Sequence, residues 1–198
     1  DRGIRYITLT HSLSNHISDS SYDKNHQWNG LSEFGVSVVG EMNRLGIMVD
    51  ISHVSDDAFW QVIEVSEVAL IASHSSVRHF TPDFERNMAD DMIIALAEND
   101  GVIQINFGST FVTAKAREYS DKQTAAGLEW LENNPQYGPA EAYTMFPKIY
   151  EEQHGSAPFA NVDDVIDHID HVVALTSIDH VGLGSDFDGV GDSLPTGL

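Results

Sequence analysis

The 198-residue sequence has no cysteine, which excludes disulfide bonds and thiolate chemistry. Any transition-metal site must therefore use histidine, aspartate and glutamate as ligands. Basic residues are also few, because ten Lys and Arg stand against 31 Asp and Glu and give a net charge of −21. A chain with this charge repels the phosphates of nucleic acids and anionic lipid surfaces, so no nucleic-acid partner is expected.

Long apolar runs are absent too. No segment approaches the roughly 18 to 20 apolar residues that cross a bilayer, and residues 1–20 lack the basic segment and apolar run of a signal peptide. We therefore expect a soluble chain without a membrane span, in a compartment, cytoplasmic or periplasmic, that the sequence does not determine. What is present is a 41% hydrophobic content over the usual length of one domain, which is enough for a core.

Short β-rich runs alternate with segments of helical periodicity. Ser32 is predicted to cap a helix that stops at Gly46, Ser55 to cap a second helix, and residues 90–99 to form a third. Strands joined by helices are typical of parallel β/α units, since parallel strands need a crossover. The five predicted strands are residues 4–10, 47–52, 69–73, 101–107 and 180–185.

Two further features complete the predicted organisation. In the first helix, the apolar residues Phe34, Val38, Met42 and Leu45 recur every three or four positions and predict its buried face. Residues 113–160 are rich in Glu, Tyr, Asn and Pro, interrupt the alternation, and are predicted to be a partly helical insertion at one loop. No low-complexity linker divides the chain, so residues 1–198 are predicted to form a single domain.

Four polar residues occupy equivalent places, directly after predicted strands. His11, His53, His74 and Asp186 follow YITLT, MVDIS, LIAS and VGLGS. In β/α folds the carboxyl ends of the strands carry the chemistry, and neutral imidazoles with carboxylates match the ligand set of a hydrolytic zinc centre. A single histidine is more often a structural residue, but four such residues at one rim favour a metal-dependent hydrolase of the barrel type.

Several strings resemble the membrane (renal) dipeptidase family, zinc metallopeptidases of the amidohydrolase superfamily. They are THS at 10–12, GEMNRLGIMVDISHVS at 40–55, SHSSVR at 73–78, RNMADD at 86–91 and GLGSDFDG at 182–189. The resemblance implies a (β/α)8 barrel of the TIM type, in which two zinc ions and a bridging water hydrolyse dipeptides. It also implies a homodimer.

The resemblance further implies a role for each matching residue. His53 and His74 would ligate one zinc ion, and Asp186 would ligate the other and take the proton of the bridging water. His11 would bind the substrate and stabilise its tetrahedral intermediate. Arg86 would bind the carboxylate of the substrate, for which its planar fork is suited. Arg78 and His79, in the same loop, are interpreted as residues of the surface, with Arg78 in an ion pair.

The sequence also departs from the family pattern. That pattern has a His-x-Asp pair on the first strand and a bridging Glu on a later one, both upstream of residues 4–10, and neither is here. The His168-Ile169-Asp170 string lies in a predicted helix, where residues two apart point to different sides, so we interpret it as structural. Five strands cannot close an eight-stranded barrel. The chain is therefore predicted to be the C-terminal portion of a barrel whose first strands are missing.

Three alternatives stay open. The string DFDGVGD at 186–192 has oxygen ligands at alternate positions, as calcium loops do, although the twelfth position of such a loop is Gly197 where a Glu is needed. The enzyme could be a related amidohydrolase that acts on another amide or a lactam. The chain could also be an inactive fragment that lacks the upstream ligands.

Overall fold

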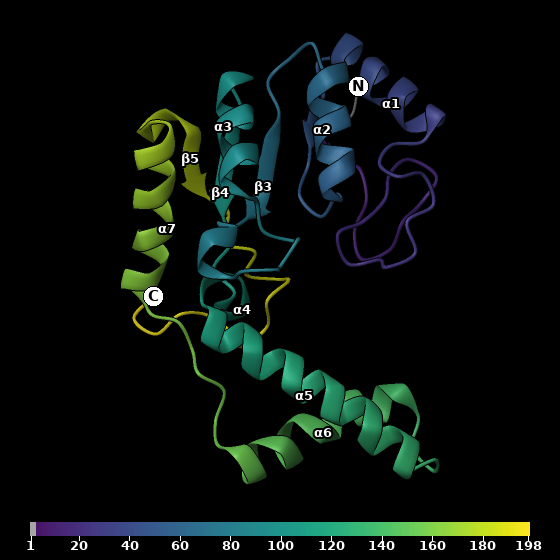
Figure 1. Cartoon of the computed structure of the whole chain (residues 1–198), viewed down its shortest axis with the longest axis vertical. Helices are drawn as coiled ribbons and strands as arrows, with labels where there is room; N and C mark the ends of the chain where they lie inside the picture. Colours follow the sequence, from purple (N-terminus) through teal and green to yellow (C-terminus); the bar gives the residue numbers. More distant parts are fainter. Residues whose placement is uncertain (1–2) are drawn as a thin grey trace.

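The computed structural model describes residues 3–198, and its centre is a five-stranded parallel sheet (Figure 1). The strands lie side by side in chain order, β1-β2-β3-β4-β5, and every neighbouring pair is parallel. All five predicted strands are thus confirmed, and residues 1 and 2 of the predicted domain lie outside the described residues. The strands are β1 (Tyr6–Thr8), β2 (Met48–Asp50), β3 (Ile71–Ser75), β4 (Val102–Ile105) and β5 (Val181–Leu183).

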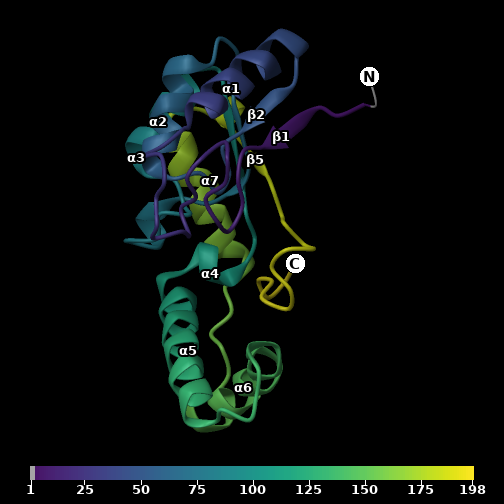
Figure 2. The same cartoon turned by 90° about the vertical axis from the view of Figure 1, so that its right-hand side faces the viewer.

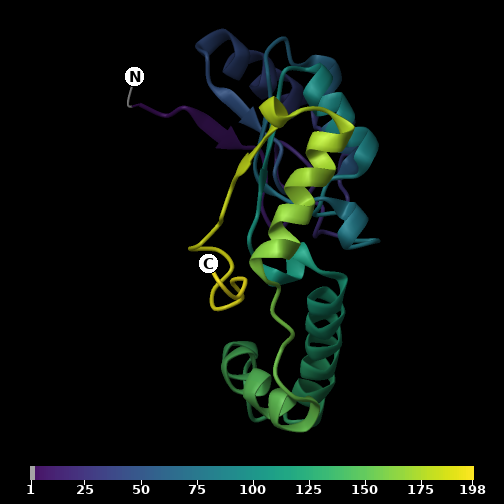
Figure 3. The same ribbon diagram turned by 90° about the vertical axis from the view of Figure 1, so that its left-hand side faces the viewer.

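Four helices cover one face of this sheet, as the two edge-on views show (Figures 2 and 3). They are α1 (Glu33–Leu45), α2 (Asp56–Val65), α3 (Asp90–Glu98) and α7 (Val162–Leu175). Val49 on β2 faces them and is fully buried, whereas the register partners Tyr6 and Met48 are 49% and 41% exposed on the other face. The apolar core therefore lies between the sheet and its single layer of helices.

Serine and glycine residues set the ends of the first two helices, as predicted. The Ser32 side chain accepts a hydrogen bond from the Gly35 N–H, and Ser55 caps α2 in the same way. Gly46 ends α1 in the left-handed conformation, with φ 68°, which suits a residue without a Cβ atom. Two 3-10 turns, η1 (Arg78–Phe80) and η2 (Ile178–His180), follow β3 and α7.

The predicted face of α1 is wrong at two of its four residues. Met42 is buried and Val38 packs against the core, but Phe34 and Leu45 are 60% and 54% exposed, and Gly35 and Val39 are buried in their place. The reason is a close approach, because a Cβ atom at position 35 would lie 2.1 Å from the Ile17 carbonyl oxygen. A glycine therefore decides which side of the helix meets the loop before it, and a count of apolar residues cannot show this.

Residues 109–154 form three helices beyond the carboxyl ends of the strands. They are α4 (Ser109–Val112), α5 (Ala114–Asn133) and α6 (Pro139–His154), and the α5–α6 pair extends away from the sheet (Figure 1). That this pair is an insertion into the domain stays a prediction. Within residues 3–198, no helix has the length and apolar character that a membrane crossing requires.

We predict that Ser32→Ala lowers the free energy of unfolding by roughly 1 to 2 kcal/mol, because the helix loses its cap. The Ser32 hydroxyl also donates to the His16 carbonyl at 2.6 Å, so the same change loosens the loop before α1. Urea unfolding would measure the effect. Ser37→Ala is the control, since Ser37 is exposed and bonds only to Glu33 of its own helix. Equal losses in the two variants would contradict the capping role.

Candidate metal centre

The carboxyl ends of β2 and β3 bring two predicted ligands together. His53 Nε2 lies 2.8 Å from His74 Nε2, although the residues are 21 positions apart. His53 follows β2 with φ 73°, a left-handed conformation that is rare for residues other than glycine. Strained backbone of this kind is found mainly where a side chain must point into a site. The two imidazoles therefore face one another at the rim where the sequence predicted them.

A buried carboxylate fixes the proton on His74. Asp50 accepts hydrogen bonds from the hydroxyls of Thr8 and Ser73, both at 2.6 Å, and from the amides of Ser52 and Ser73, both at 3.0 Å. Since the Ser73 hydroxyl proton goes to Asp50, its oxygen must accept from His74 Nδ1, which lies 2.7 Å away. His74 thus carries its proton on Nδ1 and presents a lone pair at Nε2.

His53 completes a pair of nitrogens suited to a cation. Burial is the main cause that lowers the pKa of His53, to about 2, and it also lowers the pKa of His74, so both rings are neutral at pH 7. The buried Nδ1 of His53 has no hydrogen-bond partner among residues 3–198. Two nitrogens on one zinc ion would lie roughly 3.3 Å apart. An ion between the two Nε2 atoms needs them about 0.5 Å further apart than the observed 2.8 Å, which a small rotation of the rings supplies.

His11 lies beside this pair. Its ring centroid is 4.3 Å from that of His53, and its Nδ1 is 2.9 Å from the Ser12 hydroxyl. The side chain is exposed, unlike that of His53. His11 is thus placed to meet a molecule that enters from solvent toward the His53–His74 pair.

Arg86 is buried beneath the site and is only 3% exposed. Its Nη1 donates to the Ser75 hydroxyl at 2.7 Å, and its Nη2 to the His74 carbonyl at 2.6 Å. Burial lowers the pKa of Arg86 to about 10, so the guanidinium is charged at neutral pH. Its Nε–H is buried and has no hydrogen-bond partner within residues 3–198.

Asp186 follows β5 and is oriented by a residue that the sequence reading did not single out. Asn106, at the end of β4, donates from Nδ2 to the Asp186 carboxylate at 2.9 Å. Asp186 has φ 56°, and a Cβ atom at Gly189 would lie 2.3 Å from its Oδ1. The glycine therefore leaves the space that the carboxylate fills.

The structure does not place all predicted ligands within reach of one ion. Among residues 3–198, His53, His74 and Asp186 are not a set whose ligand atoms all lie within 4.8 Å of one another. The turn after β5 is closed by N–H groups of Gly189 and Val190, which both donate to the Asp186 carbonyl. Asp188 is exposed and makes no hydrogen bond with the described residues.

Two other residues have the structural roles that the sequence suggested. Arg78 donates to both carboxylate oxygens of Asp56, at 2.7 and 2.6 Å. His168 is fully buried in α7, where its Nδ1 accepts from the Val77 N–H and its Nε2 donates to the Val112 carbonyl. Both ring nitrogens of His168 are therefore occupied, and it is unsuited to bind a metal.

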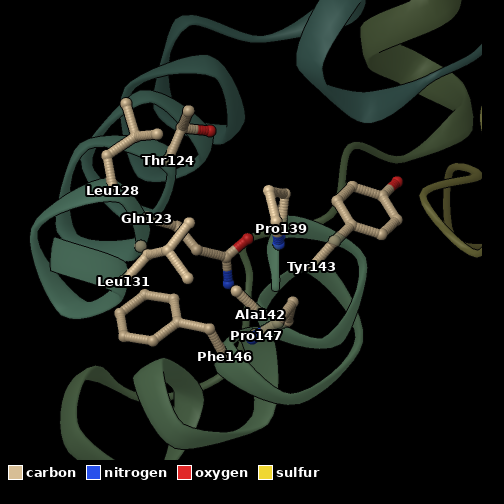
Figure 4. Close-up of a pocket in the computed structure, with 10 residues that line it drawn as sticks. Gln123, Thr124, Leu128, Leu131, Pro139, Ala142, Tyr143, Phe146 and Pro147 are labelled. Atoms are coloured by element: carbon tan, nitrogen blue, oxygen red, sulfur yellow. The ribbon is translucent and has the colours of Figure 1, made fainter. Parts of the chain in front are cut away.

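The hollow between α5 and α6 does not offer comparable chemistry. Figure 4 shows its lining, which is mostly apolar and has no carboxylate, imidazole or cation among the described residues. The residues are Gln123, Thr124, Gly127, Leu128, Leu131, Pro139, Ala142, Tyr143, Phe146 and Pro147. This hollow therefore offers no metal ligand comparable to the histidines of the rim.

The whole chain matches a known protein family. The model of the membrane dipeptidase family, peptidase family M19, matches residues 1–198. An uncharacterized dipeptidase of Schizosaccharomyces pombe is 35% identical over 198 residues, which are 99% of this chain and 38% of that protein. Dipeptidase tcpJ of Claviceps purpurea is 34% identical over 188 residues, or 95% of this chain and 34% of that protein. The chain thus spans less than half the length of these relatives.

Solved structures agree with the sequence relatives. The probable dipeptidase PvdM from Pseudomonas aeruginosa superposes with a TM-score of 0.79 and 27% identity, over 96% of this chain and 52% of its own. A metallopeptidase from Rhodobacter sphaeroides, liganded with a phosphinate mimic of the dipeptide L-Ala-D-Ala, has a TM-score of 0.69 and 25% identity, over 98% of this chain and 45% of its own. These likenesses confirm the predicted α/β fold class, part of a metallopeptidase barrel. The chain belongs to the membrane dipeptidase family, peptidase family M19.

Proposed function

We propose that the protein containing this chain is a zinc-dependent dipeptidase, and that His53 and His74 hold one of two zinc ions. The observation that carries the proposal is the 2.8 Å approach of the two Nε2 atoms, with the Nε2 lone pair of His74 fixed by Ser73 and Asp50. Asp186 is assigned to the second ion, which agrees with its position outside a common set with the two histidines. The R. sphaeroides relative, with its dipeptide mimic, supports the substrate class.

The proposed chemistry divides between the metal and the side chains. Two zinc ions when bound would lower the pKa of a shared water toward 7 and so supply a hydroxide that can attack a peptide carbonyl. Asp186 would take the proton of the attacking water and pass it to the leaving amine. Asn106 would keep the carboxylate in place for this transfer through its hydrogen bond.

His11 and Arg86 would handle the two ends of the substrate. A hydrogen bond from the exposed His11 ring would stabilise the oxyanion that develops on the attacked carbonyl. Arg86 has five N–H groups, of which the chain uses two, and its unpaired Nε–H would bind the substrate carboxylate. A free carboxylate near the scissile bond is what distinguishes a dipeptide from most other amides.

The direct test uses the full-length protein with a panel of dipeptides, N-capped and C-amidated dipeptides, and a lactam. Hydrolysis of free dipeptides, lost with a chelator and restored by zinc, supports the proposal. Turnover of the amidated compounds or the lactam at equal kcat/KM would indicate a related amidohydrolase. Zinc bound without turnover of any compound would indicate an inactive protein.

We predict that Asp50→Asn weakens zinc binding at the His53–His74 pair about 10- to 100-fold, the usual effect of losing a partner behind a metal ligand. An Asn amide would donate to the Ser73 oxygen, so the Ser73 hydroxyl would turn to donate to His74 Nδ1. The proton of His74 would then move to Nε2 and remove the lone pair. Zinc titration against a competing chelator measures this. Unchanged affinity in a folded variant would contradict the tautomer argument.

A second prediction concerns Arg86→Lys, which keeps the charge but loses the fork. KM for dipeptides should rise at least tenfold while kcat falls less, because the group binds substrate and does not react. The structure adds a stability cost of about 2 kcal/mol, since the bonds to Ser75 and His74 are partly lost. Steady-state kinetics on the folded fraction separates the two effects. An unchanged KM would remove Arg86 from the substrate site.

A third prediction distinguishes the two carboxylates of the SDFDG string. Asp186→Asn should lower kcat at least about a hundredfold, the low end of what an acid–base group contributes. Asp188→Asn is the matched control and should change kcat less than about threefold, because Asp188 is exposed and makes no hydrogen bond with the described residues. The reverse pattern in kcat would move the proton transfer to Asp188.

A further inference from the structure

A second group of metal-ligating side chains lies away from the sheet rim. His79, Asp90 and His171 each offer one ligand atom, and the three atoms all lie within 4.8 Å of one another. His79 comes from η1, Asp90 is the first residue of α3, and His171 lies in α7. Three elements thus meet at one point, and one of them, α7, is about 80 residues away from the other two in the sequence.

The contacts within this group are close and specific. His171 Nε2 lies 3.0 Å from Asp90 Oδ1. The His79 ring stacks on the His171 ring, with centroids 4.7 Å apart and an interplanar angle of 24°. Two imidazoles and one carboxylate are a ligand set that zinc accepts, with one position left for water.

A simpler interpretation is an imidazole–carboxylate pair with aromatic packing. It accounts for the His171–Asp90 contact and for the packing of His79 against Phe80. This interpretation does not explain why the ligand atom of His79 lies within 4.8 Å of the ligand atoms of both Asp90 and His171. His79 is exposed, so its ring can turn by the roughly 1 Å that would bring three ligand atoms to the 3.2–3.5 Å spacing of a tetrahedral ion. The net charge of −21 further favours a cation.

We propose that His79, Asp90 and His171 bind one divalent transition-metal ion such as zinc. This ion is separate from the His53–His74 centre. The ion fastens the segment from residue 79 to residue 90 to α7 at both of its ends. Arg86 lies within this segment, so the ion would also hold the loop that carries the buried guanidinium. The site is therefore a clamp behind the proposed substrate anchor.

The test is a zinc titration of the full-length protein, already loaded at its catalytic centre, by calorimetry at roughly pH 7.5, where histidine is mostly neutral. The wild type should bind one further equivalent of zinc. His171→Gln and His79→Gln should each weaken that binding at least tenfold, and His79→Gln answers the question even if His171→Gln fails to fold. His154→Gln, on the exposed side of α6, should leave it unchanged. Equal titrations of all four proteins would overturn the proposal.

The clamp has its own readout in amide hydrogen exchange. The further equivalent of zinc should slow exchange in residues 79–90 at least threefold in the wild type and leave it unchanged in His79→Gln. This comparison does not depend on turnover, so it stands whether or not the protein is a dipeptidase. Equal exchange rates with and without zinc in the wild type would overturn the clamp.

Discussion

The rim of the sheet depends on the hydrogen bonds that the Asp50 carboxylate accepts. This carboxylate is fully buried, yet it accepts four hydrogen bonds, from Thr8 on β1, from Ser73 on β3 and from Ser52 in its own loop. A buried charge without partners costs several kcal/mol, and hydrogen bonds to a charged group offset that cost. The same four bonds fix the register of three strands and the protonation of His74, so packing and chemistry share one anchor.

Two residues of the rim adopt left-handed backbone conformations that cost of order 1–3 kcal/mol each. They are His53 and Asp186, which follow β2 and β5. Such angles turn the chain sharply after a strand and direct the next side chain across the rim. The surrounding structure holds them, through the missing Cβ of Gly189 beside Asp186 and the carbonyl of His53 that accepts from the Ser21 N–H. Two of the five described non-glycine residues with positive φ thus lie where the proposed ligands must converge.

Much of this rim could be predicted, because the carboxyl ends of parallel strands meet at one edge and residues just after an apolar run are easy to locate. His53 and His74 met as expected. Asp50 and Asn106 were missed since each lies inside a predicted strand, where a polar residue gives no sign of its partner. Their partners are set by strand register, which the sequence alone does not reveal. The homodimer and the ligands upstream of residue 4 stay predictions, since neither concerns contacts within this chain.

The sequential order of the strands has a consequence for how the chain can fold and vary. Each strand pairs with its neighbour in the sequence, so the sheet can grow one β/α unit at a time. The connection from β4 to β5 contains α5 and α6 and is the longest. The entropy of closing a loop rises by only about 0.6 kcal/mol for each doubling of its length. Changes in the length of the α5–α6 pair should therefore be cheap, and this pair is where relatives can differ most without disturbing the order of the strands.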